Sequence, residues 1–419
     1  MYRKSELANG VRLVTERMPH VRSVSMGIWV TTGSRDEAPR EAGISHFIEH
    51  MVFKGTKRRD ARQIAYEIDR IGGASNAFTS KETTCFHARV IDEHVPVMVD
   101  ILADIFLESV FAPREIERER HVVLQEIGLA QDTPDEYIHD LLSQSMWGEH
   151  PLGSPVLGTA ETVRSIGRRQ IRGYIKRSYG PRNVLIAAAG NLDHGQLLAL
   201  LEPLFGGLAA NGAARPRSTP TPQARVSVFG RELEQVHLCL GLMGPQATAP
   251  ERYAASLLNV VLGGSMSSRL FQSVRERCGL AYSIYSFLSS YVDTGMLGIY
   301  AGVDAAELPR ALMLIGRELR RLKRRAVGED ELRAAKDHLR GSILLSAEST
   351  DNRMTRLARN EINFGRFLPY DEILAGIEAV SAQELRELAN RLFREELLSV
   401  VTLGPVEEER LPREALKLK

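Results

Sequence analysis

Cysteine and long apolar runs are both scarce in this chain. Only 3 of the 419 residues are cysteines, the widely separated Cys85, Cys239 and Cys278. Such an odd, scattered set provides no disulfide framework and favours a reducing compartment. No apolar run approaches the roughly 20 residues of a membrane-spanning helix, and the N-terminus lacks the apolar segment of a signal peptide. We therefore expect a cytoplasmic protein of bacterial type, with a removed targeting peptide as the alternative.

Excess charge of either sign is also missing. The chain has 54 Lys and Arg residues against 53 Asp and Glu residues, a net charge of +1. This balance argues against nucleic acid or an anionic membrane as the main partner. The most basic segment, Arg317–Arg325, is interpreted as the solvated face of a helix. With 43% hydrophobic residues, a chain of this length can bury large cores and exceeds one ordinary domain, so two domains are expected.

A stretch rich in Ala, Pro, Ser and Thr interrupts the periodic pattern near the middle of the chain and predicts a linker at 213–223. The domains on either side, 1–212 and 224–419, read as a degenerate repeat. Strands followed by long helices, with little strict alternation, predict an α+β fold with a similar α/β sandwich in each domain. The expected opening strands lie at 24–30 and 236–242, and the closing strands at 183–189 and 398–403.

The most informative residues are His46, Glu49 and His50. A helix start after Gly43 and an apolar frame predict a helix on which the two imidazoles project together, about one turn apart. Neutral imidazoles are good zinc ligands, and Glu49 lies beside them where it can accept a proton from a water on the metal. A helix with two satisfied core histidines is the alternative, but it leaves a buried Glu49 without a partner. The corresponding helix of the second half, at 254–262, has no such residues.

The order His-x-x-Glu-His is the inverzincin signature, and several further segments extend the likeness. The chain resembles the pitrilysin family of zinc peptidases, most closely its processing-peptidase branch of bacterial proteases and mitochondrial processing peptidase subunits. The resemblance implies a duplicated α/β-sandwich fold, one zinc ion per chain and hydrolysis of peptide bonds. The segments that carry it are 43–56, 72–80, 117–127, 150–153 and 267–282.

The resemblance also implies a third zinc ligand, Glu126, within the sequence Val-Leu-Gln-Glu-Ile. Glu119 lies two helical turns earlier on the same face, where it can orient a ligand or the water during catalysis. Spacing alone does not separate Glu126 from Glu115 or Glu117. In the implied mechanism, Glu49 removes a proton from the water and later delivers it to the leaving amine.

The segment 74–90 follows a Gly-Gly turn and alternates like a strand. In the family such a strand lies at a sheet edge beside the zinc, where it can take an extended peptide by strand addition. Asn76 and Ala77 would then bind the substrate backbone near the scissile bond. The alternative is an ordinary edge strand after a turn, with Asn76 in a left-handed conformation.

Arg275 and Tyr282 belong to a segment that reads as a helix ending at Gly279. By resemblance they reach over the active site, where the guanidinium can hold a peptide carbonyl and the phenol can stabilise the oxyanion. The alternative is a surface Arg at a helix end and a Tyr in a strand. The preceding Gly263 and Gly264 predict a helix-ending turn.

Taken together, the motif and the resemblance imply a zinc-dependent endopeptidase that acts on short or unfolded peptides. Three alternatives remain: a dedicated processing-peptidase subunit that works with a paralogous partner, a non-catalytic core subunit of this fold, and a metal-binding structural module. Longer relatives enclose a chamber with four domains in one chain. We therefore expect a two-fold homodimer, or a heterodimer with a paralogue, in which the zinc domain of one subunit faces Arg275 and Tyr282 of the other.

Overall fold

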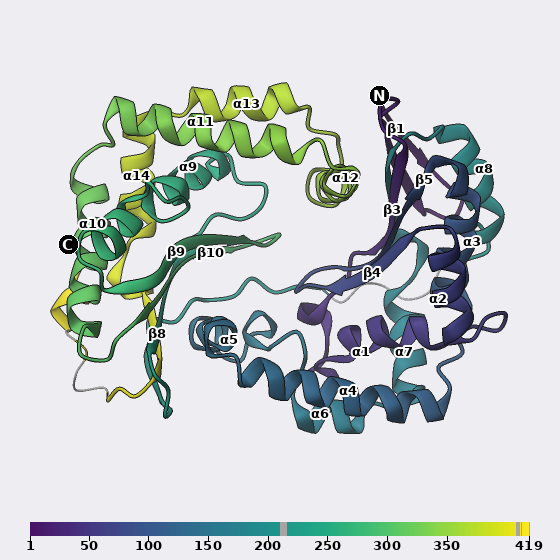
Figure 1. Cartoon of the computed structure of the whole chain (residues 1–419), viewed down its shortest axis with the longest axis horizontal. Helices are drawn as coiled ribbons and strands as arrows, with labels where there is room; N and C mark the ends of the chain where they lie inside the picture. The colour runs from purple at the N-terminus through teal and green to yellow at the C-terminus, as the bar shows by residue number, and fades with distance from the viewer. Residues whose placement is uncertain (210–215, 408–410, 412, 419) are drawn as a thin grey trace. The chain divides into compact units, whose positions relative to one another are not determined.

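The computed structural model describes residues 1–209, 216–407, 411 and 413–418, which form two compact units (Figure 1). Neither unit is continuous in sequence. Within the described residues, no helix combines the length and the apolar character that crossing a bilayer requires. Unit 1 comprises Met1–Leu129, Ser154–Ser218 and Leu345–Phe367, and unit 2 comprises Ala130–Gly153, Thr219–Leu344 and Leu368–Lys419.

A six-stranded sheet forms the centre of unit 1. Its strands are β1 (Tyr2–Glu6), β2 (Arg12–Arg17), β3 (Ser23–Val30), β4 (Ala74–Thr79), β5 (Thr84–Ile91) and β6 (Val184–Gly190). They are ordered β1-β2-β6-β3-β5-β4, and only β2 and β6 run parallel. Side chains of β3 alternate between the faces, so Met26 and Ile28 belong to one core and Trp29 to the other. Both faces of the sheet are therefore apolar and need a cover.

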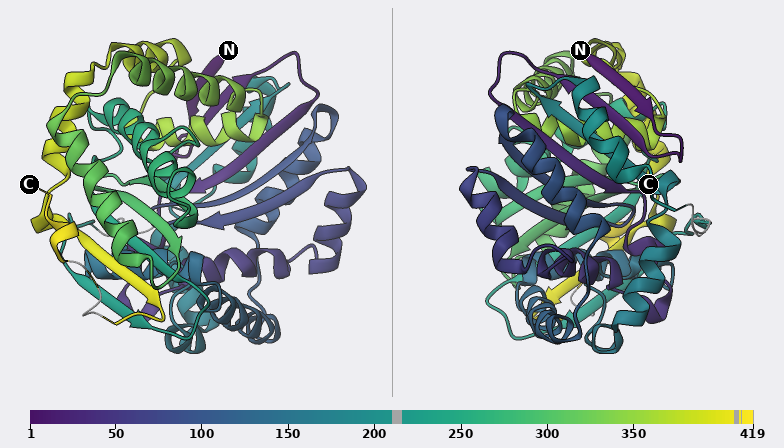
Figure 2. Two further views of the ribbon diagram at one scale, coloured as in Figure 1. Left: turned by 60° about the vertical axis from the view of Figure 1, so that its left-hand side comes forward. Right: turned by 90° about the vertical axis from the view of Figure 1, so that its right-hand side faces the viewer.

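Helices cover both faces of this sheet (Figures 1 and 2). They are α1 (Ile44–Met51), α2 (Ala61–Arg70), α3 (Val95–Leu107), α4 (Pro113–Gln131), α6 (Ala160–Ser165), α7 (Arg168–Ser178), α8 (His194–Phe205) and α12 (Thr350–Phe364). The first seven contribute to the larger core, in which Phe47, Phe86 and Phe205 are fully buried. On the opposite face, Met354 and Leu357 of α12 join the cluster around Trp29. Burial of this apolar surface is the main contribution to the stability of the unit.

Unit 2 is built on a five-stranded sheet. Its strands are β7 (Val226–Gly230), β8 (Val236–Gly244), β9 (Ala281–Ser290), β10 (Gly295–Val303) and β11 (Ser399–Gly404). They are ordered β7-β11-β8-β10-β9, and only β7 and β11 run parallel. Figure 2 shows the sheet from two further directions.

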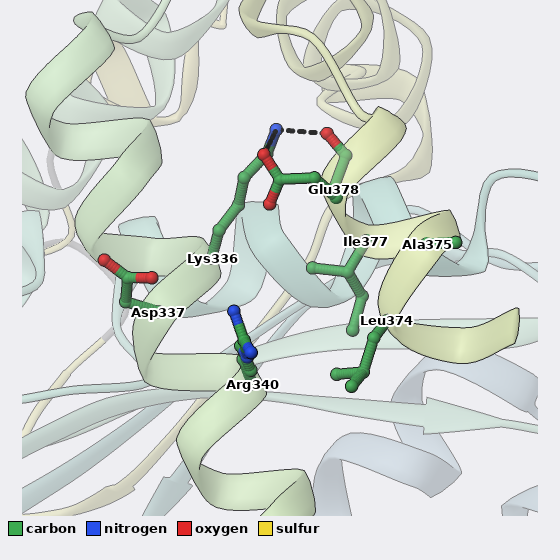
Figure 3. Close-up of a pocket in the computed structure, with 7 residues that line it drawn as sticks. All are labelled: Lys336, Asp337, Arg340, Leu374, Ala375, Ile377 and Glu378. Atoms are coloured by element: carbon green, nitrogen blue, oxygen red, sulfur yellow. Dashed lines mark hydrogen bonds and ion pairs between the residues drawn. The ribbon is translucent and has the colours of Figure 1, made fainter. Parts of the chain in front are cut away.

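The helices of unit 2 also lie on both faces of their sheet. They are α5 (Pro134–Trp147), α9 (Arg252–Leu262), α10 (Leu308–Arg324), α11 (Glu329–Ser346), α13 (Tyr370–Ala379) and α14 (Ala382–Leu392). α9, α10 and α14 contribute to the core on one face, and Leu142 and Met146 of α5 pack with Cys239 and Val401 on the other. α11 and α13 lie side by side, and Lys336 of α11 donates a hydrogen bond to the carbonyl oxygen of Glu378 (Figure 3).

Apart from the additional edge strand β1 in unit 1, the two sheets have the same topology. β7, β11, β8, β10 and β9 take in unit 2 the places of β2, β6, β3, β5 and β4 in unit 1, with the same parallel and antiparallel pairs. This confirms the repeated α+β sandwich that the sequence predicts, and β3, β8, β6 and β11 lie where the opening and closing strands are expected. The helix after the opening strand is α1 in unit 1 and α9 in unit 2. Gly263 ends α9, as the Gly-Gly pair indicates.

The compact units differ in two segments from the contiguous domains 1–212 and 224–419. α5 belongs to the first half of the sequence but packs on the sheet of unit 2, whereas α12 belongs to the second half but packs on the sheet of unit 1. Each sheet needs a second cover, and the other half of the chain supplies it. The chain leaves unit 1 after Ser218, within the expected linker at 213–223, of which 213–215 lie outside the described residues.

Candidate metal centre

α1 separates its apolar and ionisable residues onto opposite sides. The 3.6-residue period of the helix turns His46, Glu49 and His50 to one side. The other side is buried in the core of unit 1 and anchors the helix. The buried apolar residues are Ile44, Phe47, Ile48 and Met51.

The start of α1 is capped by a residue outside the helix. Gly43 precedes the helix with φ +89°, and a Cβ atom there would lie 2.5 Å from the carbonyl oxygen of Leu157, so both conformation and space require glycine. Because glycine has no capping side chain, the carboxylate of Glu37 accepts hydrogen bonds from the backbone N–H groups of Gly43 (2.7 Å) and Ser45 (2.8 Å). Burial raises the pKa of Glu37 to about 8, against the effect of these hydrogen bonds.

His46, His50 and Glu126 bring three possible ligand atoms within 4.8 Å of one another. Oε2 of Glu126, on α4, lies 3.6 Å from Nε2 of His46 and 3.3 Å from Nε2 of His50. All three residues are partly exposed, so an ion and a water can reach them. Two imidazoles and one carboxylate fit a catalytic zinc ion and leave a coordination position open. No other group of three such residues gathers in this way among the residues that the structure describes.

The electrostatic environment suits His46 for binding a metal and Glu49 for accepting a proton. Burial, and secondarily the neighbouring His50, lowers the pKa of His46 to about 4, so its imidazole is neutral at neutral pH and free to bind a metal. Burial raises the pKa of Glu49 above its ordinary value, although the hydroxyl of Thr79 donates to its Oε2 at 2.6 Å and opposes the rise. Glu49 is therefore a stronger base than an exposed carboxylate. Sequence reasoning did not single out Thr79, because a hydroxyl on a strand carries no distinctive signal.

Glu119 lies behind His50. Its side chain is 7% exposed, and its Oε2 is 3.2 Å from Nδ1 of His50. Its Oε1 is 2.8 Å from Nζ of Lys54. Glu119 thus occupies the place of a carboxylate that orients a metal ligand, as its spacing from Glu126 suggests. Lys54 was not among the residues singled out from sequence, although its position one turn after His50 was a usable signal.

β4 is an edge strand, as expected, since it pairs with β5 and ends the strand order of its sheet. Asn76 is exposed, and its Oδ1 accepts a hydrogen bond from the backbone N–H of Ala77 at 2.8 Å. The alternative of a left-handed Asn76 is wrong, because Phe111 is the one described residue other than glycine with a positive φ. The extended backbone satisfies the pairing with β5 instead.

Arg275 and Tyr282 lie in unit 2 and contact each other. Arg275 is on a π-helix, Phe271–Glu276, where the sequence predicts an ordinary helix; Gly279 follows with φ +61°. The guanidinium carbon lies 4.8 Å from the ring centre of Phe271 and 5.3 Å from that of Tyr282. Tyr282, on β9, is 80% exposed. The rings of Phe271 and Tyr282 thus both contact the guanidinium of Arg275. The ring of Tyr282 is also the phenol that is open to solvent.

Known proteins resemble the chain along most of its length. Residues 12–160 match the family described as Insulinase (Peptidase family M16), and residues 165–339 match the description Peptidase M16 inactive domain. A Bacillus subtilis protein described as the uncharacterized zinc protease YmxG is 45% identical over 94% of this chain and 97% of its own length. A Streptomyces coelicolor protein, also described as an uncharacterized zinc protease, is 39% identical over 98% of this chain and 91% of its own length.

Two solved structures share the fold. A protease from Helicobacter pylori matches with a TM-score of 0.89 and 21% identity over 97% of this chain and 100% of its own. A Pseudomonas fluorescens structure described as a peptidase M16 inactive domain matches with a TM-score of 0.89 and 20% identity over 97% of this chain and 98% of its own. Identities this low establish a common fold and nothing more specific.

Proposed function

Because the chain belongs to the insulinase family of peptidases, family M16, we propose that it is a zinc-dependent endopeptidase acting on short or unfolded peptides. The observation that carries the proposal is that the side chains of His46, His50 and Glu126 lie close together in unit 1, with Glu49 beside them. The three ligands would hold one zinc ion, and the open position would take a water. A purely structural metal site would need neither an open coordination position nor a base such as Glu49 beside it.

The chain's own residues provide the proton transfers of the proposed reaction. A bound zinc ion would supply Lewis acidity to the water and to the peptide carbonyl. Glu49, whose pKa is raised mainly by burial, takes a proton from the water and then delivers it to the leaving amine. Thr79 holds Oε2 of Glu49 through a 2.6 Å hydrogen bond, which fixes the carboxylate while the proton moves.

We infer the class of substrate from the edge strand β4. An extended peptide can add to its free edge through main-chain hydrogen bonds, which are largely indifferent to side chains. We assign Asn76 and Ala77 to this contact because they lie on the strand that also carries Thr79. A folded protein does not offer a free strand, so short and unfolded peptides are the expected substrates.

We further propose that Arg275 and Tyr282 act at the metal centre of a second copy of the chain in a two-fold homodimer. The exposed phenol can donate to a developing oxyanion, and the guanidinium can hold a peptide carbonyl. Mixing Glu49→Gln subunits with Arg275→Ala/Tyr282→Phe subunits should then restore roughly a quarter of the activity. No restoration despite proven subunit exchange would exclude this arrangement.

The proposed activity is tested with a mixture of short peptides and a set of folded proteins. The purified protein is incubated with both, with and without a chelator, and the products are identified by mass spectrometry. We expect many cuts in the peptides and few in the folded proteins, loss of cutting with the chelator, and recovery with added zinc. Cutting that survives both the chelator and Glu49→Gln would contradict the proposal.

A further inference from the structure

The two histidines of the metal centre differ in what lies behind them. Both direct Nε2 toward Glu126. Nδ1 of His50 lies 3.2 Å from Oε2 of Glu119, whereas Nδ1 of His46 is buried and has no hydrogen-bond partner among the described residues. Of the two imidazoles, only that of His50 is therefore held from behind by a polar side chain among the described residues.

Lys54 contacts the second carboxylate oxygen of Glu119. Nζ of Lys54 lies 2.8 Å from Oε1 of Glu119. The side chain of Glu119 is 7% exposed, and that of Lys54 is 32% exposed. With Oε1 on Lys54 and Oε2 on His50, both oxygens of Glu119 have a defined partner. A carboxylate held at both oxygens cannot rotate away from the imidazole without losing an ion pair.

The chain around Lys54 is itself well anchored. Lys54 ends a 3-10 helix, Val52–Lys54, that continues directly from α1, and Gly55 then turns the chain with φ +125°. The hydroxyl of Thr56 donates to the buried carboxylate of Asp104 at 2.8 Å. The ammonium group therefore approaches Glu119 from a fixed stretch of backbone.

We propose that Lys54 is a positioning residue that holds Glu119 against His50 and thereby directs Nε2 of His50 to the metal. Glu119 accepts a hydrogen bond from Nδ1–H, which selects the tautomer whose Nε2 lone pair is available as a ligand. This inference rests on the proposed metal centre, but it concerns a residue outside the three proposed ligands. Without Lys54, Glu119 can turn toward solvent and the imidazole of His50 loses its fixed orientation.

The test compares zinc affinity in Lys54→Met, Lys54→Arg and a matched control, Lys57→Met. Lys57 forms an exposed ion pair with Glu108, 2.6 Å long, three residues further along the same segment. Competition with a chromophoric chelator should show zinc binding weakened about tenfold in Lys54→Met. Lys54→Arg should stay close to wild type, and Lys57→Met should be unchanged. Equal affinity of Lys54→Met and wild type would overturn the inference.

A double-mutant cycle tests whether Lys54 acts through Glu119. In a Glu119→Gln background, Lys54→Met should change zinc affinity less than about twofold, because the carboxylate that it positions is gone. A full additional loss in that background would also overturn the inference. If Lys54→Met does not fold, as judged by circular dichroism, Lys54→Gln takes its place in both comparisons.

A tautomer measurement separates positioning from a general structural effect. In the zinc-free protein with ¹⁵N-labelled histidine, nitrogen chemical shifts should report His50 with its proton on Nδ1 in wild type and in Lys54→Arg. In Lys54→Met the two tautomers should mix, and an unchanged tautomer would contradict the role. Since this measurement needs no metal, a wild-type protein that failed to bind zinc would refute the proposed function without affecting this result.

Discussion

The same position in the two repeats is occupied by two very different helices. α1 follows β3 in unit 1 and carries His46, Glu49 and His50, whereas α9 follows β8 in unit 2 and is buried along most of its length. α9 packs with α13 and α14. α1 holds ionisable groups in a partly buried place, where the pKa of His46 is lowered and that of Glu49 raised. The framework thus accepts either helix, and of the two only α1 carries the proposed ligands and base.

The comparison extends to the helices that follow. α4 comes after α3 as α11 comes after α10, and α4 carries Glu119 and Glu126 of the candidate metal centre. α11 has a single buried residue, Ala335. The next helix in each half of the sequence, α5 or α12, then packs on the sheet built mainly from the other half. The repeats therefore share their framework and exchange equivalent helices, but differ in the residues around α1.

The largest expected effect comes from making α1 chemically inert like α9. Glu49→Gln removes the proton acceptor but leaves His46, His50 and Glu126 in place, so turnover should fall about 10²- to 10⁴-fold while zinc content stays the same. Peptide cleavage and metal analysis on the same sample check this. If zinc disappears together with activity, Glu49 is a ligand and its assignment as the base is wrong.

α5 and α12 should contribute equally to the stability of the sheets on which they pack. Leu142 on α5 and Leu357 on α12 are both buried, so Leu142→Ala and Leu357→Ala should each lower the free energy of unfolding by about 2–5 kcal/mol. The exposed Leu345 on α11 provides a control, and Leu345→Ala should change that free energy by less than about 0.5 kcal/mol. Chemical denaturation measures all three. An unchanged free energy of unfolding in Leu142→Ala would show that the packing of α5 does not stabilise unit 2.

The smallest expected effect is a loss of stability of unit 2 in acid. His139 on α5 lies with Nε2 3.0 Å from the hydroxyl of Tyr285, and His237 on β8 with Nδ1 2.9 Å from that of Tyr300. Burial lowers the pKa of both histidines below 6.5. The unfolded chain therefore binds more protons below pH 6.5, and unfolding becomes easier as the pH falls.

Replacing His139 measures its share of this acid sensitivity. His139→Gln should weaken the fall in unfolding free energy between pH 7 and pH 5. Urea denaturation at several pH values checks the slope. An unchanged slope in His139→Gln would mean that protonation of this residue does not contribute.

Local patterns predicted α1, the paired opening and closing strands and the repeat, because their signals lie within short stretches of sequence. Spacing alone did not distinguish Glu126 from Glu115 or Glu117, since all three lie on one helix and only the tertiary structure shows which faces α1. The exchange of α5 and α12 has no local signal, because an amphipathic helix does not specify which sheet it covers. Thr79 has no local signal for its contact with Glu49. The position of Lys54 one turn after His50 indicates that it lies near the site, but not that it contacts Glu119, which is distant in sequence.

The most direct test of the central claim is the zinc content of wild type, Glu126→Gln and Glu117→Gln. Glu117 lies on the same helix as Glu126 but is exposed and paired with Arg120. If unit 1 alone carries the metal centre, wild type and Glu117→Gln should hold one zinc ion per chain, and Glu126→Gln should hold much less. Two zinc ions per chain in wild type, or undiminished zinc in Glu126→Gln, would contradict the account.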